Sequence, residues 1–128
     1  MNKIVFDASA LLALLNQETG HEAVEKHLPH AVMSTVNVAE VITVLIDLGM
    51  PDNAAKEMIV EIIKEIVPFE LPHAFTSASL KKMTKSHGLS FGDRACLTLA
   101  KLKNLPVLTA DKIWGEINHN EIKIILIR

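Results

Sequence analysis

The sequence predicts an α/β protein, a three-layer α/β/α sandwich with a central, mainly parallel sheet. Short apolar runs alternate along the chain with segments whose apolar residues recur at helical spacing. Strands that are separated by helices favour parallel pairing. Apolar runs such as residues 124–127 lack the alternation of a half-exposed strand, so we expect helices on both faces of the sheet. The 128 residues contain no linker or internal repeat, which predicts one domain over residues 1–128.

The first elements are read from where apolar patterns start and stop. The apolar run 3–6 ends at Asp7 and predicts the first strand. Residues 8–16 carry leucines at helical spacing and predict a helix. A second helix is expected from about 22 to 28, because Pro29 stops it.

Two longer helices are expected in the middle of the chain. Residues 31–33 are a candidate second strand, and residues 36–48 follow with a helical pattern that Gly49 ends. Pro51 then opens a helix that runs to about residue 65. The remaining expected elements are a strand at 66–69, helices at 74–87 and 91–103, a strand at 107–109, a short helix near Ile113 and a strand at 122–127.

Composition limits the class of protein. The formal net charge of −2 excludes a surface that is positive all over, although it allows a local basic groove. No apolar run approaches the roughly 18 residues of a membrane-spanning helix, and the single Cys96 cannot form an internal disulfide, so we expect a cytoplasmic protein. The mean hydropathy of +0.28 is high, which suggests that a partner covers some apolar surface.

Two acidic residues follow strands that we expect to be neighbours. Asp7 ends the first strand, and Asp111 lies two residues after the strand at 107–109. In folds of this class a site forms outside the carboxyl ends of the strands, where the strand order reverses. Neighbouring strands lie about 4.8 Å apart. If these two strands are neighbours, Asp7 and Asp111 can share one cation.

Each acid also has a purely structural interpretation. Asp7 and Asp111 each precede a predicted helix and have the position of an N-cap. The pairs Asn37–Glu40 and Ser90–Asp93 have the spacing of a capping box. Single capping acids would carry no chemistry.

Glu40 is the acid that fits this structural interpretation least well. Apolar residues surround it almost completely on the helix 36–48, which is typical of a buried helix, and a buried carboxylate must be paired, protonated or bound to a metal. The alternative is a narrow solvated stripe formed by Asn37, Glu40 and Asp47.

Taken together, the four acids Asp7, Glu40, Asp93 and Asp111 indicate a metal site. Carboxylates clustered at one sheet edge need a cation to stay ionised together, and hard oxygen ligands favour Mg²⁺ or Mn²⁺ over zinc. Without these four, 11 acidic residues remain against 13 basic ones. That excess of positive charge suits a phosphate-bearing substrate.

Four segments of the sequence also resemble a known family, the PIN-domain ribonucleases, and within it the VapC-type toxins of toxin–antitoxin pairs. The segments are IVFDASALLALL at 4–15, STVNVAEV at 34–41, LSFGDRACL at 89–97 and LPVLTAD at 105–111, with Trp114 just after. They occur in the order and at the spacing of the family, so the resemblance covers essentially the whole chain.

The resemblance implies roles for individual residues. Asp7, Glu40, Asp93 and Asp111 match the acidic metal-site quartet. Three further residues match polar positions that support the acids, namely Ser9, Asn37 and Thr109. Arg94 matches a variable position.

It also implies an activity and partners. The family cleaves single-stranded RNA endonucleolytically with Mg²⁺ or Mn²⁺, as one half of a toxin–antitoxin pair. A cognate antitoxin and a homodimer are therefore expected beside the RNA substrate, and no membrane.

Two rival functions remain at the level of sequence. One is a non-catalytic α/β protein-binding module whose acids cap helices. The other is a phosphatase with an aspartyl nucleophile, which fits less well because the segment from Asp7 to Ser9 lacks a second acid two residues on. Cys96 fits a buried small hydrophobic residue better than a nucleophile. Most aromatic side chains are expected in the core, Trp114 included, so extensive base stacking is not expected.

Overall fold

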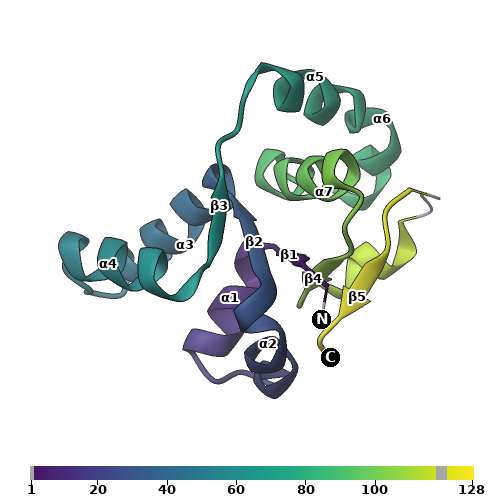
Figure 1. Cartoon of the computed structure of the whole chain (residues 1–128). Coiled ribbons are helices and arrows are strands. Elements are labelled where there is room, and N and C mark those ends of the chain that lie inside the picture. Colours follow the sequence, from purple (N-terminus) through teal and green to yellow (C-terminus); the bar gives the residue numbers. More distant parts are fainter. Residues whose placement is uncertain (1, 118–120) are drawn as a thin grey trace.

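A five-stranded parallel sheet with helices on both faces forms the structure, a computed structural model that describes residues 2–117 and 121–128 (Figure 1). Its elements in chain order are β1 (Ile4–Phe6), α1 (Ala8–Leu15), α2 (His21–His27), η1 (Leu28–His30), β2 (Ala31–Ser34), α3 (Thr35–Asp47), α4 (Asp52–Ile62), β3 (Glu65–Val67), α5 (Leu71–Ser79), α6 (Lys81–Thr84), η2 (Lys85–His87), α7 (Phe91–Lys103), β4 (Val107–Thr109), η3 (Lys112–Glu116) and β5 (Ile124–Leu126).

The strand order β3-β2-β1-β4-β5 places β1 at the centre of the sheet. It pairs in parallel with β2 on one side and with β4 on the other, so that Val5 lies opposite both Val32 and Val107. The chain first builds the sheet outward from β1 to β3 and then returns to add β4 and β5. The strand order therefore reverses between β1 and β4, the point at which such sheets form sites. The predicted sandwich with a parallel sheet is confirmed.

Alternate residues of β1 enter two separate cores. Ile4 and Phe6 pack with apolar residues of α1, α2, α3 and α4 on one face. Val5 points to the other face, where it packs with α7 and with Trp114 of η3. This alternation is the pleat of a strand covered on both sides. Trp114 is fully buried, as expected from the sequence.

Several predicted boundaries are wrong, among them that of the strand expected at 122–127, which covers only Ile124–Leu126. The helix after Pro51 ends at Ile62, and β3 begins at Glu65, a residue that the sequence had placed in the helix. The single helix expected over 74–87 is three shorter elements that start earlier, at Leu71. Pro72 suits a first helical turn, where its missing N–H leaves no bond unmade. The first break comes at Leu80, whose side chain is buried in the second core.

Helix α3 is not buried all round, in contrast to the interpretation from its apolar residues. Its buried face carries Asn37, Val41 and Leu45, whereas Leu48 just beyond its end is 69% exposed. The alternative of a solvated stripe is also wrong for Asn37, which is buried. Glu40 is half-buried. In the part of the chain that the structure describes, no helix is long and apolar enough to cross a membrane.

Candidate active site

Asp7 lies at the carboxyl end of β1 and is almost completely buried, with 4% of its surface exposed. Its N–H donates to the carbonyl of Leu108 on the neighbouring strand β4. Its extended backbone makes it the N-cap of α1, and its Oδ1 accepts a hydrogen bond of 2.8 Å from the N–H of Ala10. The strand and the helix together fix where this carboxylate lies.

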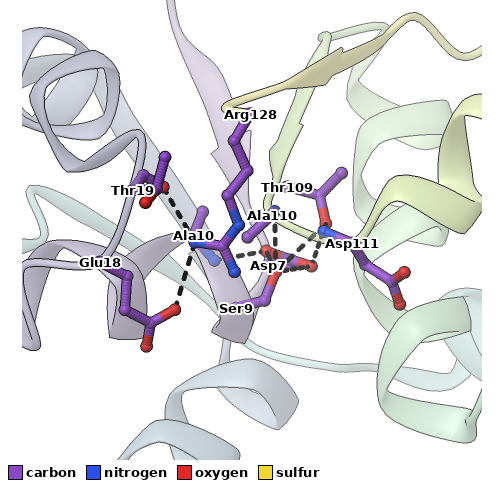
Figure 2. Close-up of polar contacts among 9 residues, drawn as sticks. All are labelled: Asp7, Ser9, Ala10, Glu18, Thr19, Thr109, Ala110, Asp111 and Arg128. Carbon is purple, nitrogen blue, oxygen red and sulfur yellow. Dashed lines mark hydrogen bonds and ion pairs between the residues drawn. The ribbon is translucent and has the colours of Figure 1, made fainter.

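Two adjacent hydroxyl groups, of Ser9 and Thr109, contact the Asp7 carboxylate (Figure 2). Ser9 Oγ lies 2.8 Å from both carboxylate oxygens, and Thr109 Oγ1 donates to Oδ2 at 2.6 Å. Each hydroxyl also accepts a backbone N–H from the segment after β4, Ser9 from Ala110 at 3.0 Å and Thr109 from Asp111 at 3.1 Å. The ends of β1 and β4 are thereby joined around Asp7.

The pKa of Asp7 is raised to about 6, and burial is the largest cause. The hydrogen bonds from Thr109, Ala10 and Ser9 lower it, and the negative charge of Asp93 raises it further. Among the described residues, no Lys or Arg side chain forms an ion pair with this carboxylate. Asp7 is thus a buried acid with hydrogen-bond donors and a like-charged neighbour but without a counter-charge.

Glu40 lies against the beginning of α7. Asn37 Nδ2 donates both to Glu40 Oε1 at 2.8 Å and to the carbonyl of Gly92 at 3.0 Å. The Glu40 carboxylate packs on Gly92 so closely that a Cβ at that position would overlap it. The capping box predicted for Asn37–Glu40 is absent, because the N-cap of α3 is Ser34. Asn37 instead orients Glu40 toward α7.

Asp93 occupies the first turn of α7 and forms the predicted capping box with Ser90. Ser90 Oγ accepts from the N–H of Asp93 at 3.2 Å, and Asp93 Oδ2 accepts from the N–H of Ser90 at 2.9 Å. One turn further on, the thiol of Cys96 is buried, and burial raises its pKa. The charges of Asp7, Asp93 and Glu40 raise the same pKa further, so all three acids lie in the neighbourhood of Cys96.

Asp111 differs from the other three acids. Its Oδ1 accepts from the N–H of Ile113 at 3.1 Å and so caps η3. The side chain is exposed, and in Figure 2 it extends away from Asp7 although the two residues follow neighbouring strands. Asp7, Glu40 and Asp93 thus lie in one region near the beginning of α7, whereas the Asp111 carboxylate extends away from Asp7.

Within the described residues, no three His, Cys, Asp or Glu side chains are close enough to form a metal-binding group as they stand. The ligand atoms on offer nevertheless fit a hard divalent cation. They are carboxylate oxygens, and among the described residues no Lys or Arg forms an ion pair with Asp7, Glu40 or Asp93. Asn37 Oδ1, next to Glu40, is also buried without a hydrogen-bond partner. Mg²⁺ keeps several of its waters and needs only one or two direct carboxylates.

Helix capping does not remove these acids from such a role. The capping hydrogen bonds of Asp7, Asp93 and Asp111 are all present, as the structural interpretation predicts. Asp93 uses only Oδ2 for its cap, and Asp111 uses only Oδ1. A carboxylate offers about four acceptor sites on two oxygens, so each retains an oxygen for another ligand.

Comparison with known proteins gives the family. The sequence model of the PIN domain matches residues 4–120. The chain belongs to the PIN domain family. A comparison with curated proteins finds no match.

Solved structures show that the PIN domain described above has the fold of several toxin–antitoxin proteins. A DNA-bound VapBC from Salmonella typhimurium is 16% identical and matches over 100% of both chains with a TM-score of 0.75. A toxin–antitoxin complex from Klebsiella pneumoniae is 20% identical, with 94% of this chain and 95% of that chain covered and a TM-score of 0.72. VapC20 of Mycobacterium tuberculosis, described as a sarcin–ricin loop cleaving toxin, is 15% identical over 94% and 99%, with a TM-score of 0.74.

One residue of the candidate site, Gly92, was not predicted from the sequence. Gly92 gives the Glu40 carboxylate the space in which it lies. A signal was present, because a glycine within a helix costs about 1 kcal/mol relative to alanine and thus needs a reason. The reason becomes visible only when α3 and α7 are packed together.

Proposed function

We propose that this PIN domain is an endoribonuclease that cleaves single-stranded RNA with Mg²⁺ or Mn²⁺. The observation that carries the proposal is the state of Asp7, a buried carboxylate with like-charged Asp93 nearby and no basic ion-pair partner among the described residues. Capping one backbone N–H explains the position of Asp7 but leaves its desolvated charge uncompensated. A bound divalent cation compensates that charge.

In this proposal Asp7, Glu40 and Asp93 hold the cation, and Asp111 at the rim contributes directly or through water. When bound, the cation lowers the pKa of a bound water and neutralises charge that develops on the scissile phosphate. The protein's own residues position the acids. Ser9 and Thr109 fix both oxygens of Asp7, and Asn37 fixes Glu40. Each supporting residue thus acts through an acid.

We further propose that the chain is the toxin of a toxin–antitoxin pair and binds a cognate antitoxin. A toxin–antitoxin complex and a DNA-bound VapBC have this fold, and so does VapC20, which is described as a sarcin–ricin loop cleaving toxin. An apolar hollow of about 400 Å³ is open on the surface and suits apolar side chains of such a partner. It is lined by Leu15, Asn16, Leu45, Leu48, Met50 and Met58.

A homodimer is part of the same proposal. Large apolar side chains remain exposed on several elements of the chain, which agrees with the high mean hydropathy. The most exposed are Leu48, Val60, Leu71 and Phe75. Light scattering coupled to gel filtration should give twice the chain mass of 14.1 kDa. A monomer at the highest concentration tested would refute the dimer without affecting the proposed reaction.

Cleavage of a labelled single-stranded RNA tests the activity. The wild-type protein should cut the RNA with Mg²⁺ or Mn²⁺ and stop when EDTA is in excess. Asp7→Asn and Asp93→Asn should each lower the rate about 100-fold or more, because each removes a charged oxygen ligand. Asp47→Asn, at an exposed acid on the same protein, is the matched control and should cleave normally.

The second candidate function is the non-catalytic binding module, and the three observed capping bonds favour it. It predicts that Mn²⁺ leaves the melting temperature unchanged and that RNA stays intact. Cleavage that persists in EDTA, or in Asp7→Asn, would contradict the proposed site rather than support the module.

A further inference from the structure

Three aromatic rings lie together at the surface beside the candidate site. Phe69 follows β3, His73 lies in the first turn of α5, and Phe91 is the first residue of α7. The ring of Phe69 meets Phe91 edge to face, with centroids 5.5 Å apart and an interplanar angle of 77°, and meets His73 at 5.7 Å and 86°. We refer to Phe69, His73 and Phe91 as the aromatic cluster.

The aromatic cluster is open to solvent, contrary to the expectation that most aromatic residues lie in the core. Phe91 is 50% exposed, and Phe69 and His73 are half-buried. In an edge-to-face pair only one ring contributes its face to the contact. In the Phe69–Phe91 pair, at least one ring face is therefore free of contact with the other ring.

The aromatic cluster is fixed to the same elements as the acids. The N–H of Phe69 donates to Thr35 Oγ1 at 3.0 Å, at the start of α3, which also carries Glu40. Phe91 directly precedes Gly92, on which the Glu40 carboxylate packs, and lies two residues before Asp93. Phe91 thus lies in the same helical turn as Asp93, and Phe69 is joined to the start of the helix that carries Glu40.

The charge of the preceding segment agrees with a nucleic-acid ligand. α6 and η2, which lead into the beginning of α7, carry the exposed lysines 81, 82 and 85. Within residues 2–117 and 121–128, no ion pair involves any of them. Single-stranded nucleic acids are bound by aromatic faces that stack on bases together with positive charge along the backbone. A purely apolar protein partner would not need that charge.

We propose that the ring of Phe91, supported edge to face by Phe69, is a stacking platform for one nucleobase of the RNA strand next to the bond that is cut. This inference rests on the proposed ribonuclease function and adds to it a contact with the base, which the acids themselves cannot supply. The platform stacks on any base, because every base has a π-face, and so positions the strand without selecting a sequence.

The test is binding of a short single-stranded RNA that contains 2-aminopurine, whose fluorescence falls when it stacks. EDTA keeps the RNA intact during the measurement. The wild-type protein and Phe91→Trp should quench the fluorescence. Phe91→Ala should lose the quenching and bind about tenfold or more weakly, and Phe91→Leu should resemble it because an aliphatic side chain has no ring face. Leu102→Ala is the matched control, at an apolar side chain that is 47% exposed on the same helix α7, and it should bind and quench like the wild-type protein.

Cleavage kinetics give a second, independent measurement. With Mg²⁺, Phe91→Ala should raise KM and leave kcat at saturating RNA nearly unchanged, whereas loss of an acid lowers kcat. If Phe91→Ala binds and quenches like the wild-type protein, the platform is refuted. A change in oligomeric mass or in protein binding with unchanged RNA binding also refutes it, in favour of a protein contact.

The outcomes separate the platform from the function on which it rests. If the wild-type protein cleaves RNA and Phe91→Ala cleaves it with the same KM, only the platform fails. If the wild-type protein binds and quenches the RNA through Phe91 without cleaving it, the nuclease proposal fails and the platform stands. If it neither binds nor cleaves RNA, both are overturned.

Discussion

The carboxylate of Glu40 lies against the Cα of Gly92, in space that any side chain at position 92 would occupy. Asn37 holds both partners of this contact, since its Nδ2 donates to Glu40 Oε1 and to the Gly92 carbonyl. Helix α3, which carries Glu40, and helix α7, which carries Asp93, are therefore joined by one glycine, one amide and one carboxylate.

Gly92→Ala should move the Glu40 carboxylate away from α7 and lower RNA cleavage about tenfold or more. Stability should change little, because Glu40 ends in a flexible side chain that can rotate and alanine favours the helix by about 1 kcal/mol. Cleavage rates and thermal melts measure the two effects. In a protein that already carries Glu40→Gln, Gly92→Ala should lower RNA cleavage much less, because both substitutions act through the side chain at position 40. Full activity of Gly92→Ala would contradict a role for Glu40.

Asn37→Ala should both destabilise the protein and lower its activity. The substitution removes both hydrogen bonds of Asn37 Nδ2, which costs about 1–3 kcal/mol in total, and it frees Glu40. Chemical denaturation and cleavage assays should show both losses. Thr43→Ala, at an exposed residue of the same helix, should leave the activity unchanged. An Asn37→Ala protein with normal cleavage would show that Glu40 needs no such support.

Asp7→Asn should stabilise the metal-free protein at neutral pH. The folded-state pKa of Asp7, about 6, lies above the ordinary value of 3.8, so ionisation of this carboxyl opposes folding. In EDTA, the free energy of unfolding of the wild-type protein, compared with that of Asp7→Asn, should fall by up to roughly 3 kcal/mol as the pH rises from about 4 to about 6. Above that pH the difference should stay constant.

Denaturation curves of both proteins across this range measure the difference. Asp111→Asn is the control, because that acid is exposed and asparagine caps helices as well as aspartate does. An Asp7→Asn protein that is less stable than the wild-type protein at pH 7 would mean that the Asp7 carboxylate has a counter-charge already.

Cys96 should not react with thiol reagents in the folded protein. Its thiol is fully buried, and burial together with the nearby acids keeps its pKa well above the ordinary value, so the reactive thiolate is absent. A colorimetric disulfide reagent at pH 8 should react only after urea unfolds the chain. Fast reaction in native buffer would contradict the packing of α7 against the sheet.

The sequence predicted those elements whose limits have local signals. The bounds of α7, Phe91–Lys103, were predicted as found, because Ser90 and Asp93 form a capping box and the helical pattern stops at Asn104. The break at Leu80 has no such signal, because a buried leucine fits a continuous helix as well as a broken one. Likewise, the residues after Ile62 fit either a last helical turn or a strand, and pairing with β2 decides between them.

The position of some candidate residues in the fold was predictable, and the geometry of the site was not. The positions of Asp7 and Asp111 after two parallel strands follow from the pattern, whereas the pairing of these strands as neighbours is a finding of the structure. The direction of the Asp111 side chain does not, because it depends on the bond between Oδ1 and the N–H of Ile113. The exposure of Phe91 was also missed, since an apolar residue at the start of a helix looks the same in sequence whether or not another element covers it.

The central claim is that Asp7 and its acidic neighbours bind a divalent cation, and titration of the metal-free protein with Mn²⁺ in a calorimeter tests it most directly. The account predicts saturable binding by the wild-type protein, a rise in its melting temperature with Mn²⁺, and loss of both in Asp7→Asn. Absence of binding to the wild-type protein, or equal binding by Asp7→Asn, would contradict it.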